Sequence, residues 1–445
     1  MNVKFVVVSL DTVGARRLAC LGGNQVATPH LDRIAAESAL FTKAFASDIP
    51  TQPSHTALFT GHFGASSGIV SHFHPNSHLS ESVPWLPSLM RNEGCRTGAV
   101  DHLFSMKEWF IRGYEDYLVP PGRSRSPGSV INEMAFPWLD EHASEDFFLF
   151  LHFWDAHIPY VPPEPFLSRY TAGLETVDPE LQSKLRSRPS YPLFKRNLYD
   201  VIGDVPSLEY IEALHYAEIA YLDHEIGRLR AKLESLGVLD DCTMVIFGDH
   251  GENMTEHDSW FDHAGLYDSV VHVPLMIRSP GRVAPTRIDD LVQLVDVMPT
   301  LLELHDMSDR VDMADLDGKS MVPLIKGETL DHRNFVVLSE CTWQAKRAVR
   351  NHDWKYIRCW DAGIYPRDCA ELYHLPSDPT EQRNLAQDRP DVVAQMDAVL
   401  QKWLDDRVDG DADPMHDVIQ VGLPAVRRLE GVVLEDAALV SGTDR

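Results

Sequence analysis

Short, nearly continuous apolar runs alternate with helical patterns along most of this chain, and this alternation restricts the fold more than any other feature. The apolar runs cover residues 3–10, 95–100, 147–154, 242–249 and 273–279. Helical patterns cover residues 29–39 and 214–236 and begin again near residue 296. Apolar strands separated by helices are typical of a parallel sheet buried on both faces. We therefore predict an α/β fold in which helices sandwich a mostly parallel sheet.

The pattern changes after about residue 335. Three runs predict antiparallel strands, at residues 335–340, 347–360 and 370–375, and residues 392–403 predict one helix. This texture is typical of a smaller α+β unit rather than of a continued parallel sheet.

These two sequence patterns suggest where one domain ends and the next begins. We assign residues 1–335 to a catalytic domain, 336–408 to a small C-terminal α+β domain and 409–445 to an acidic tail. Residues 162–207 are rich in proline, serine and charge, and we expect an insertion or lid there. We expect the tail to pack on a partner subunit or to remain mobile, which leaves a homo-oligomer open.

Charge and composition exclude some classes of partner. The formal net charge of the 445 residues is -27 and no basic cluster is present, so we expect no nucleic-acid or anionic-membrane binding. The six cysteines form no C-x-x-C pair, which is typical of free thiols in a reducing compartment. No apolar run reaches membrane-span length. A cytoplasmic protein acting on a small molecule is the expectation.

Three aspartates stand at or just past the ends of apolar runs: Asp11, Asp155 and Asp249. In parallel sheets, ligands collect at the carboxyl ends of the strands. Taken singly these signals are weak, since an aspartate after a strand is often a turn or capping residue. Thr51, two residues before Pro53, is equally typical of a helix start.

The combination is more specific. Asp11, Thr51 and Asp249 offer oxygen ligands and His250 offers nitrogen, a mixed set that suits Zn²⁺ or Mn²⁺. Mg²⁺ and Ca²⁺ more often take oxygen alone. A divalent cation lowers the pKa of a hydroxyl and polarises a phosphoryl or sulfuryl oxygen. Thr51 is therefore a candidate nucleophile as well as a candidate ligand.

Several ordered motifs carry a family resemblance. The segments "VVVSLDTVGARRLACLGG", "TQPSHTALFTG", "IFGDHGENMTEHDSWFDHAGLYDSVVHVPLMIRSPG" and "ELYHLPSDPTEQRNLA" span nearly the whole chain. They resemble the alkaline-phosphatase/sulfatase superfamily, and specifically its sulfatase-like branch. The resemblance implies an α/β sandwich, a metal-dependent ester hydrolase and a nucleophile in the second motif.

The chain departs from true sulfatases at the nucleophile. That family has a cysteine or serine converted to formylglycine, with an arginine four residues on, where this chain has Thr51 and His55. A second aspartate of the opening motif is replaced by Thr12. The segment that usually supplies a lysine and a histidine offers only His102 and Lys107, which we expect to bind substrate.

What remains resembles the superfamily members with a threonine nucleophile: nucleotide pyrophosphatase/phosphodiesterases, lipoteichoic acid synthase and phosphoethanolamine transferases. Their metal-binding acidic residue, threonine, aspartate and histidine correspond to Asp11, Thr51, Asp249 and His250. In the transferases further histidines line the site, and three here match them: His152, His157 and His263.

We predict a metal-dependent hydrolase of phosphodiesters or phosphonate monoesters that passes through a covalent phospho-threonine at Thr51. His55, His157 and His263 are expected to stabilise charge, protonate the leaving group or hold a second metal, and His152 to contact the substrate. The alternatives are a sulfuric-ester hydrolase without formylglycine, a soluble phosphotransferase and a non-catalytic binding protein on the same scaffold. Specificity is expected to come from residues 162–207, from residues 106–113 and from Trp343.

Overall fold

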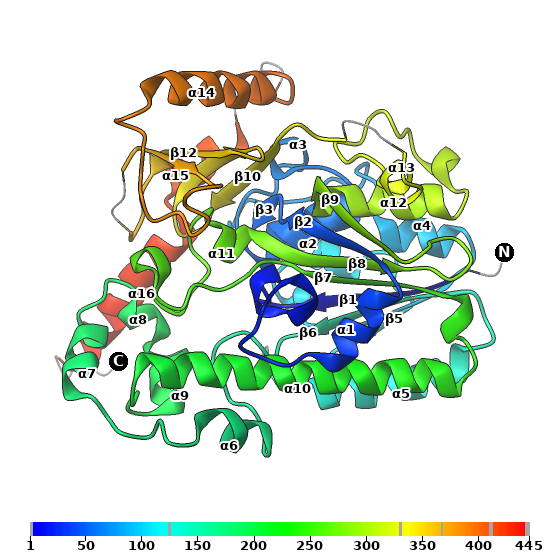
Figure 1. The fold of residues 1–445 in the computed structure, drawn as a ribbon, viewed down its shortest axis with the longest axis horizontal. Coiled ribbons are helices and arrows are strands. Elements are labelled where there is room, and N and C mark those ends of the chain that lie inside the picture. Colours follow the sequence, from blue (N-terminus) through cyan, green and yellow to red (C-terminus); the bar gives the residue numbers. More distant parts are fainter. Residues whose placement is uncertain (1–2, 123–125, 329–331, 366–367, 409–412, 441–445) are drawn as a thin grey trace.

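A large sheet with helices on both faces and a smaller sheet beside it make up the fold (Figure 1). The computed structural model describes residues 3–122, 126–328, 332–365, 368–408 and 413–440, the last eight by their backbone. The large sheet has the order β5-β4-β6-β1-β7-β8-β2-β9. Its strands are β1 (Lys4–Leu10), β2 (Ala39–Phe45), β4 (Arg96–Val100), β5 (Asp116–Leu118), β6 (Phe147–Phe153), β7 (Cys242–Gly248), β8 (His272–Arg278) and β9 (Thr286–Gln293).

The central strand β1 aligns the ends of its neighbours. It pairs in parallel with β6 and β7, and Leu10 lies opposite both Phe153 and Gly248. All seven residues of β1 are buried, as expected for an apolar strand covered on both faces. The chain therefore leaves all three strands at one edge, which brings Asp11 and Asp249 close together.

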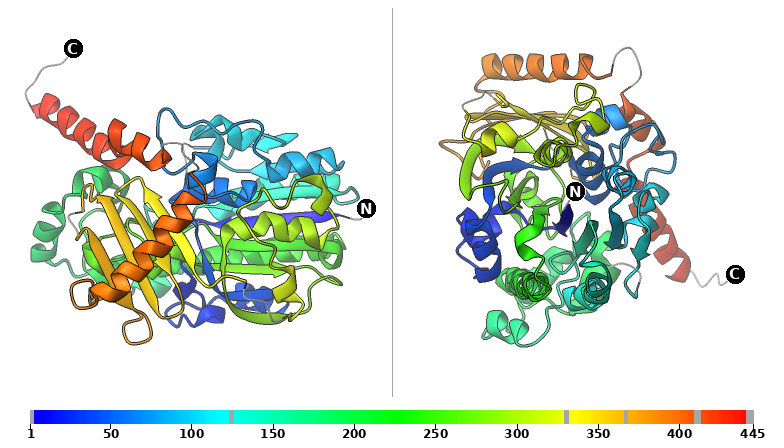
Figure 2. Two further views of the ribbon diagram at one scale, coloured as in Figure 1. Left: turned by 90° about the horizontal axis from the view of Figure 1, so that it is seen from above. Right: turned by 90° about the vertical axis from the view of Figure 1, so that its right-hand side faces the viewer.

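Helices cover both faces of this sheet (Figures 1 and 2). Three helices pack on one face: α1 (Pro29–Ala36), α5 (Gly128–His142) and α10 (Leu208–Ser235). Three helices pack on the other: α2 (Thr51–Thr60), α4 (Leu86–Asn92) and α12 (Val297–Leu304). In α10 the predicted apolar stripe is buried at Leu222, Ile226, Leu229 and Leu233. The predicted α/β class, with a mostly parallel sheet between helices, is confirmed.

Two elements differ from the sequence expectation. The strand β8 runs antiparallel to β7, because the segment between them carries no long crossover helix and returns from the same sheet edge. The helix predicted to reach residue 39 ends at Ala36, and Ala39 already begins β2. A short polar turn thus separates two elements that share an apolar pattern.

The smaller sheet has the order β13-β12-β11-β10-β3. Its strands are β3 (Asp48–Ile49), β10 (Val336–Cys341), β11 (Ala345–Arg350), β12 (Trp354–Asp361) and β13 (Ala370–His374), and α14 (Pro390–Asp405) lies across it (Figure 2). The edge strand β3 comes from the N-terminal part of the chain and directly precedes α2. The small sheet is therefore attached next to the start of α2.

Short helices fill residues 162–207: α6 (Phe166–Thr171), α7 (Pro179–Arg186), α8 (Tyr191–Phe194) and α9 (Asp200–Ile202). Other short helices are α3 (Gly64–Ser67), α11 (Asp268–Val271) and α13 (Val322–Ile325). No helix in the described part of the chain is long and apolar enough to span a membrane.

The C-terminal segment contains two helices, α15 (Pro414–Val421) and α16 (Pro424–Val440). The helix α15 packs on α3 and β10, and α16 packs on α8. This segment was expected to pack on a partner subunit or to remain mobile. Through α15 and the start of α16 it packs on its own chain, and packing on a partner subunit stays a prediction. Residues 409–412 and 441–445 of the predicted tail lie outside the described residues, and the predicted domain boundaries stay a prediction.

A buried ion network joins the two sheets. Asp268 at the start of α11 accepts from Lys355 Nζ at 2.6 Å and from the guanidinium of Arg350 at 3.2 Å. Lys355 also contacts Glu381 at 2.6 Å. Burial opposes ionisation of Asp268, but Lys355 and Arg350 outweigh it and hold the pKa of this carboxyl well below its usual range. The network therefore stabilises the attachment of the small sheet.

We expect Asp268→Asn to lower the free energy of unfolding by about 3 kcal/mol, because it leaves buried cations without their shared carboxylate. The pKa of Asp268 is depressed in the folded state, so its stabilisation is present above the unfolded pKa of about 3.9 and is lost as pH falls. The difference between wild type and variant should therefore shrink below about pH 4. Urea denaturation at several pH values measures it. Asp391→Asn, which removes an exposed carboxylate on α14, is the control and should leave the midpoint nearly unchanged.

Candidate active site

The start of α2 lies against the ends of β1 and β7. Thr51 is the first residue of α2, and its Oγ1 lies 3.2 Å from Nε2 of His250. One turn of α2 is tied to the strand end, since Ser54 Oγ donates to the backbone oxygen of Asp249 at 2.8 Å. The backbone N–H of His250 donates to Asp249 Oδ1 at 2.8 Å. Asp11, Thr51, Asp249 and His250 are thus brought together, as the motifs predicted.

Two carboxylate oxygens in this cluster lack a hydrogen-bond donor. Asp11 Oδ1 and Asp249 Oδ2 are buried and accept no hydrogen bond from the described residues, although His250 Nε2 lies 3.4 Å and His55 Nδ1 3.9 Å from Asp249 Oδ2. Ligand atoms of Asp11, Asp249 and His250 all lie within 4.8 Å of one another. Burial, and then the charge of Asp249, raise the pKa of Asp11 to about 6. Unpaired buried carboxylates that repel each other are the arrangement that a divalent cation stabilises.

The orientation of His250 also fits a metal site. Its Nδ1 lies 3.0 Å from the backbone oxygen of Gly251 and donates its proton there. The lone pair of Nε2 is therefore directed toward Thr51 and the two carboxylates. A metal-binding histidine commonly has its second nitrogen held in this way. The residues present fit a divalent cation held by Asp11, Asp249, His250 and the Thr51 hydroxyl.

His152 lies beneath this cluster and positions Asp11. It is fully buried, with Nδ1 2.8 Å from Asp101 Oδ1 and Nε2 3.2 Å from Asp11 Oδ2. Burial disfavours its charged form, but Asp101 and Asp11 outweigh burial and raise its pKa to about 9. His152 was expected to contact the substrate. Its place between two carboxylates makes it a positioning residue instead.

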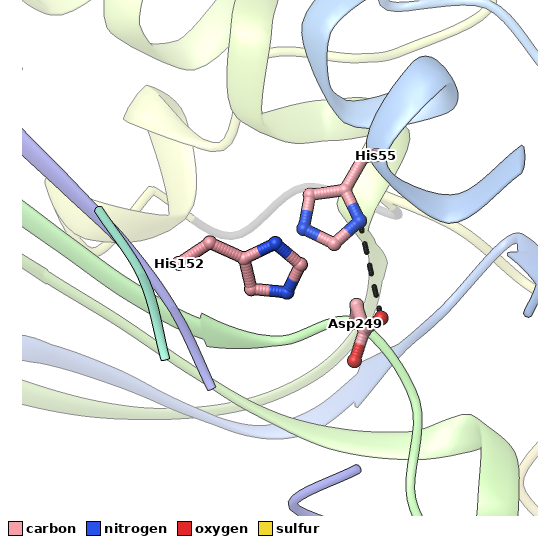
Figure 3. Close-up of side chains that lie close together, drawn as sticks. All are labelled: His55, His152 and Asp249. Atoms are coloured by element: carbon pink, nitrogen blue, oxygen red, sulfur yellow. Dashed lines mark ion pairs between the residues drawn. The ribbon is translucent and has the colours of Figure 1, made fainter. Parts of the chain in front are cut away.

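His55 lies next to His152 and Asp249 (Figure 3). Its Nδ1 is 2.7 Å from the backbone oxygen of Thr51 and its Nε2 is 2.8 Å from Ser9 Oγ. It is fully buried, and burial together with the charge of His152 lowers its pKa to about 4. A neutral, enclosed imidazole cannot reach a substrate, so the expected catalytic contact of His55 is not formed in this structure.

His55, His152 and Asp249 form a second group whose ligand atoms lie within 4.8 Å of one another (Figure 3). Both nitrogens of each histidine already have a hydrogen-bond partner. A metal ion here would have to displace those bonds. We therefore interpret this group as the support of the metal site above it.

The structure also separates His102 and Lys107 from the site. Lys107 Nζ donates to the backbone oxygens of His74 and Ser77, at 2.9 and 3.0 Å. His102 is buried behind Asp101. Neither lines the cavity described next, so the substrate contacts expected of them are not present.

A cavity of about 890 Å³ opens over Thr51. Of the predicted catalytic histidines, His157 and His263 line it. The ring of His263 lies 4.4 Å from that of His250 and 5.7 Å from that of His157. Other lining residues come from separate parts of the chain: His72, Phe73, Ser105, Met106, Trp154, Ile158, Leu193, Phe194, Asn197, Thr342, Trp343, Pro424, Ala425, Arg427 and Arg428.

His72 is a site residue that the sequence did not indicate. Its Nδ1 accepts from the backbone N–H of Gln52 at 3.4 Å, so its Nε2 carries the proton. Burial, and then the charges of His263 and His250, lower its pKa to about 3. His72 is therefore a neutral N–H donor in the cavity wall. It lies in a loop without a motif, and only its spatial neighbours identify it.

Comparison with known proteins identifies the family. The sequence profile described as "Sulfatase" matches residues 4–307, and one described as "N-sulphoglucosamine sulphohydrolase, C-terminal" matches residues 255–408. The first match covers more than half of the chain. The chain belongs to the sulfatase family, whose members are hydrolases that use a divalent metal.

Curated relatives are distant. Arylsulfatase K of Gallus gallus is 23% identical over an alignment of 462 positions, and the alignment covers 89% of this chain and 81% of that protein. Choline-sulfatase of Rhizobium meliloti (strain 1021) is 32% identical over 174 residues, which cover 39% of this chain and 32% of that protein.

Solved structures share the fold. The phosphonate monoester hydrolase of Agrobacterium radiobacter has a TM-score of 0.73 at 21% identity, covering 90% of this chain and 95% of that one. A protein in complex with its substrate D-glucosamine-2-N,6-O-disulfate has a TM-score of 0.76 at 19% identity, covering 92% and 99%. The fold therefore occurs with both phosphonate and sulfate chemistry and does not decide between them.

We expect the purified protein to bind about one divalent cation per chain, and Asp249→Asn or His250→Ala to lose it. Both changes remove a ligand from the cluster with unpaired carboxylate oxygens. Elemental analysis after gel filtration without chelators measures the metal content. Asp223→Asn is the control, because among the described residues this carboxylate accepts from the backbone N–H groups of His30 and Leu31 at the start of α1, away from the metal ligands. Full metal content in Asp249→Asn would contradict the assignment.

His152→Gln should weaken metal binding by about 10- to 100-fold, because it removes the group that orients Asp11 without removing a ligand. Competition with a fluorescent chelator measures the affinity. His142→Gln, which breaks a histidine–carboxylate contact at the end of α5, serves as the control. Equal affinity in wild type and His152→Gln would show that Asp11 needs no such support.

Proposed function

We propose that this chain is a metal-dependent hydrolase that cleaves phosphodiesters or phosphonate monoesters with Thr51 as the nucleophile. The observation that carries the proposal is the placement of the Thr51 hydroxyl at the start of α2, 3.2 Å from His250 and beside two unpaired carboxylate oxygens. The positive end of the helix dipole favours negative charge at this point. A hydroxyl in this position is the group in the cavity best placed to attack an ester.

In the first step the Thr51 oxygen attacks phosphorus in line with the ester bond. Thr51 loses its hydroxyl proton, the bond to the alcohol or phenol leaving group breaks, the leaving oxygen takes up a proton, and a covalent phospho-threonine remains. A bound divalent cation lowers the pKa of the hydroxyl and offsets the charge of the transferred group. In the second step water attacks phosphorus and releases Thr51, which takes back a proton.

The remaining cavity histidines have separate roles in this scheme. His263 lies beside His250 and is placed to contact the oxygens of the transferred group. His157, on the far side of His263, is placed to protonate the leaving group. His72 donates a hydrogen bond from its neutral ring. Electrostatic stabilisation by these groups is expected to contribute most of the rate.

A sulfuric-ester hydrolase is the second candidate, and the family match favours it, because the curated relatives include arylsulfatases. Threonine cannot become formylglycine, so such an enzyme would have to cleave sulfate esters with the hydroxyl itself. A phosphotransferase would use the same first step and an alcohol in place of water in the second. The esters and acceptors that react distinguish these two alternatives from the proposed hydrolase.

Thr51→Ala should lower kcat/KM by more than about a thousandfold, because the neighbouring hydroxyls of Ser54 and Thr12 donate to backbone oxygens of Asp249 and Asp11. Thr51→Ser should keep part of the activity. The assay uses metal-reconstituted protein on bis-nitrophenyl phosphate, nitrophenyl phenylphosphonate, nitrophenyl phosphate and nitrophenyl sulfate. We expect the diester or phosphonate to react fastest. Mass spectrometry of acid-quenched protein should find the phosphorus adduct on the peptide that contains Thr51.

Thr60→Ala is the matched control, since Thr60 lies on the same helix and its hydroxyl bonds with the backbone of Thr56 and His62, away from the metal ligands. It should retain activity per folded molecule. Preference for nitrophenyl sulfate would replace the phosphoric-ester proposal by the sulfatase alternative. Full activity of Thr51→Ala on every ester would overturn the nucleophile assignment altogether.

A further inference from the structure

The charges that face the cavity come from one helix. Among its described lining residues there is no carboxylate and no lysine, and the guanidinium groups are those of Arg427 and Arg428. Both belong to α16, and both are exposed. In a chain with 67 acidic and 40 basic residues, a cavity lined by two arginines and by no described carboxylate favours anionic ligands.

The helix α16 is held firmly at the cavity. The backbone N–H of Ala425 donates to the backbone oxygen of Thr342 at 3.1 Å. Leu423 and Ala425 are buried, and the helix packs on α8 of residues 162–207 (Figures 1 and 2). Because Pro424 and Ala425 also line the cavity, the arginines that follow in the same turn lie along its wall.

An aromatic wall connects the metal site to this helix. The ring of His263 lies 4.4 Å from His250 and 5.8 Å from Trp343, and Trp343 lies 5.7 Å from Phe194. Phe194 is the last residue of α8, the helix on which α16 packs. The wall therefore runs from the reacting centre outward to the element that carries the two arginines. A flat apolar body fits along such a wall.

Among the described residues, no carboxylate pairs with either of the two arginines. Within the described part of the chain neither forms an ion pair, whereas other arginines do, such as Arg16 with Glu256. Partial desolvation of the Arg428 guanidinium at the cavity wall lowers its pKa, with no acidic group contributing. Paired guanidinium groups left without an anion are arranged for one that arrives with a ligand.

We propose that Arg427 and Arg428 bind a second anionic group, carried on the leaving group of the substrate. The cavity volume of about 890 Å³ far exceeds a single tetrahedral anion and has room for such a leaving group. The substrate class is then an ester with a flat apolar body that bears a carboxylate, sulfonate or further phosphoryl group at its far end. This inference rests on the proposed function, in which the ester is cleaved at Thr51.

The arginines could instead contact the transferred group, and this arrangement predicts a different kinetic result. Arg428 is close enough to His72 for its charge to lower the pKa of that ring. If the arginines instead held the transferred group, their removal would affect every ester equally. The two arrangements are separated by substrates that differ only in the leaving group.

The kinetic test compares two nitrophenyl phosphonates, one of them with an added ring carboxylate, in wild type and in the double variant Arg427→Gln/Arg428→Gln. The ring carboxylate also changes the chemistry of the leaving group, so the quantity compared is the ratio of kcat/KM for the two esters. We expect this ratio to fall by about tenfold or more in the variant. Arg427→Lys/Arg428→Lys should restore part of it, and Arg186→Gln, an exposed arginine of α7 outside the cavity wall, should not change it.

An equilibrium test separates this inference from the proposed reaction. Benzylphosphonate and 4-carboxybenzylphosphonate have no ester bond, and their dissociation constants are measured by calorimetry on the metal-loaded protein. We expect wild type to bind the carboxylated compound about tenfold more tightly, and the double variant to lose this preference. If no ester is cleaved but this preference is present, the proposed reaction fails and the second anion site stands. Equal affinities in wild type, no binding of either compound, or an equal loss on both esters overturns the inference.

Discussion

The parallel pairing of β1 with β6 and β7 is the constraint on which the site depends. Because Leu10 lies opposite both Phe153 and Gly248, the chain turns out of all three strands at one edge. Two carboxylates are thereby buried side by side, and each keeps one oxygen without a donor. Repulsion between them is unfavourable unless a cation or a donor is supplied. The helix α2 lies next to this edge and offsets part of this repulsion, since its positive end and its first hydroxyl face the two carboxylates.

Much of the polar chemistry near the centre supports this arrangement rather than reacting. His55 holds the first turn of α2 through the backbone of Thr51 and is neutral in its apolar surroundings. His152 stands between Asp11 and Asp101 and is held charged by them. Two neighbouring histidines thus differ in charge. His152 is charged because its ring has carboxylate partners, and His55 is neutral because its partners are a hydroxyl and a carbonyl. Position relative to the carboxylates, not residue type, separates the supporting histidines from those in the cavity.

Local patterns predicted the elements whose environment is uniform. The strand β1 is buried throughout and the helix α10 keeps one apolar stripe, so each could be predicted from hydrophobicity alone. The direction of β8 could not, because an apolar run contains no information on which way the chain enters the sheet. The short strand β3 was also missed, since its two residues pair with β10, nearly three hundred positions away. The ligand cluster was predictable because its members follow strands or occupy the start of a helix.

The cavity wall was predictable only in part. Met106, Phe194 and Trp343 line it and belong to the segments expected to determine specificity. His72 and the arginines of α16 come from segments with no motif, and only tertiary packing brings them to the cavity. Net charge does not indicate the local charge of the cavity, because it averages over the surface: the last segment of an acidic chain supplies the arginines that line the cavity. A metal centre at strand ends can act on many esters that share one reacting group. Distinguishing among them requires groups that reach the leaving group, and in this chain those groups stand on elements added outside the sheet.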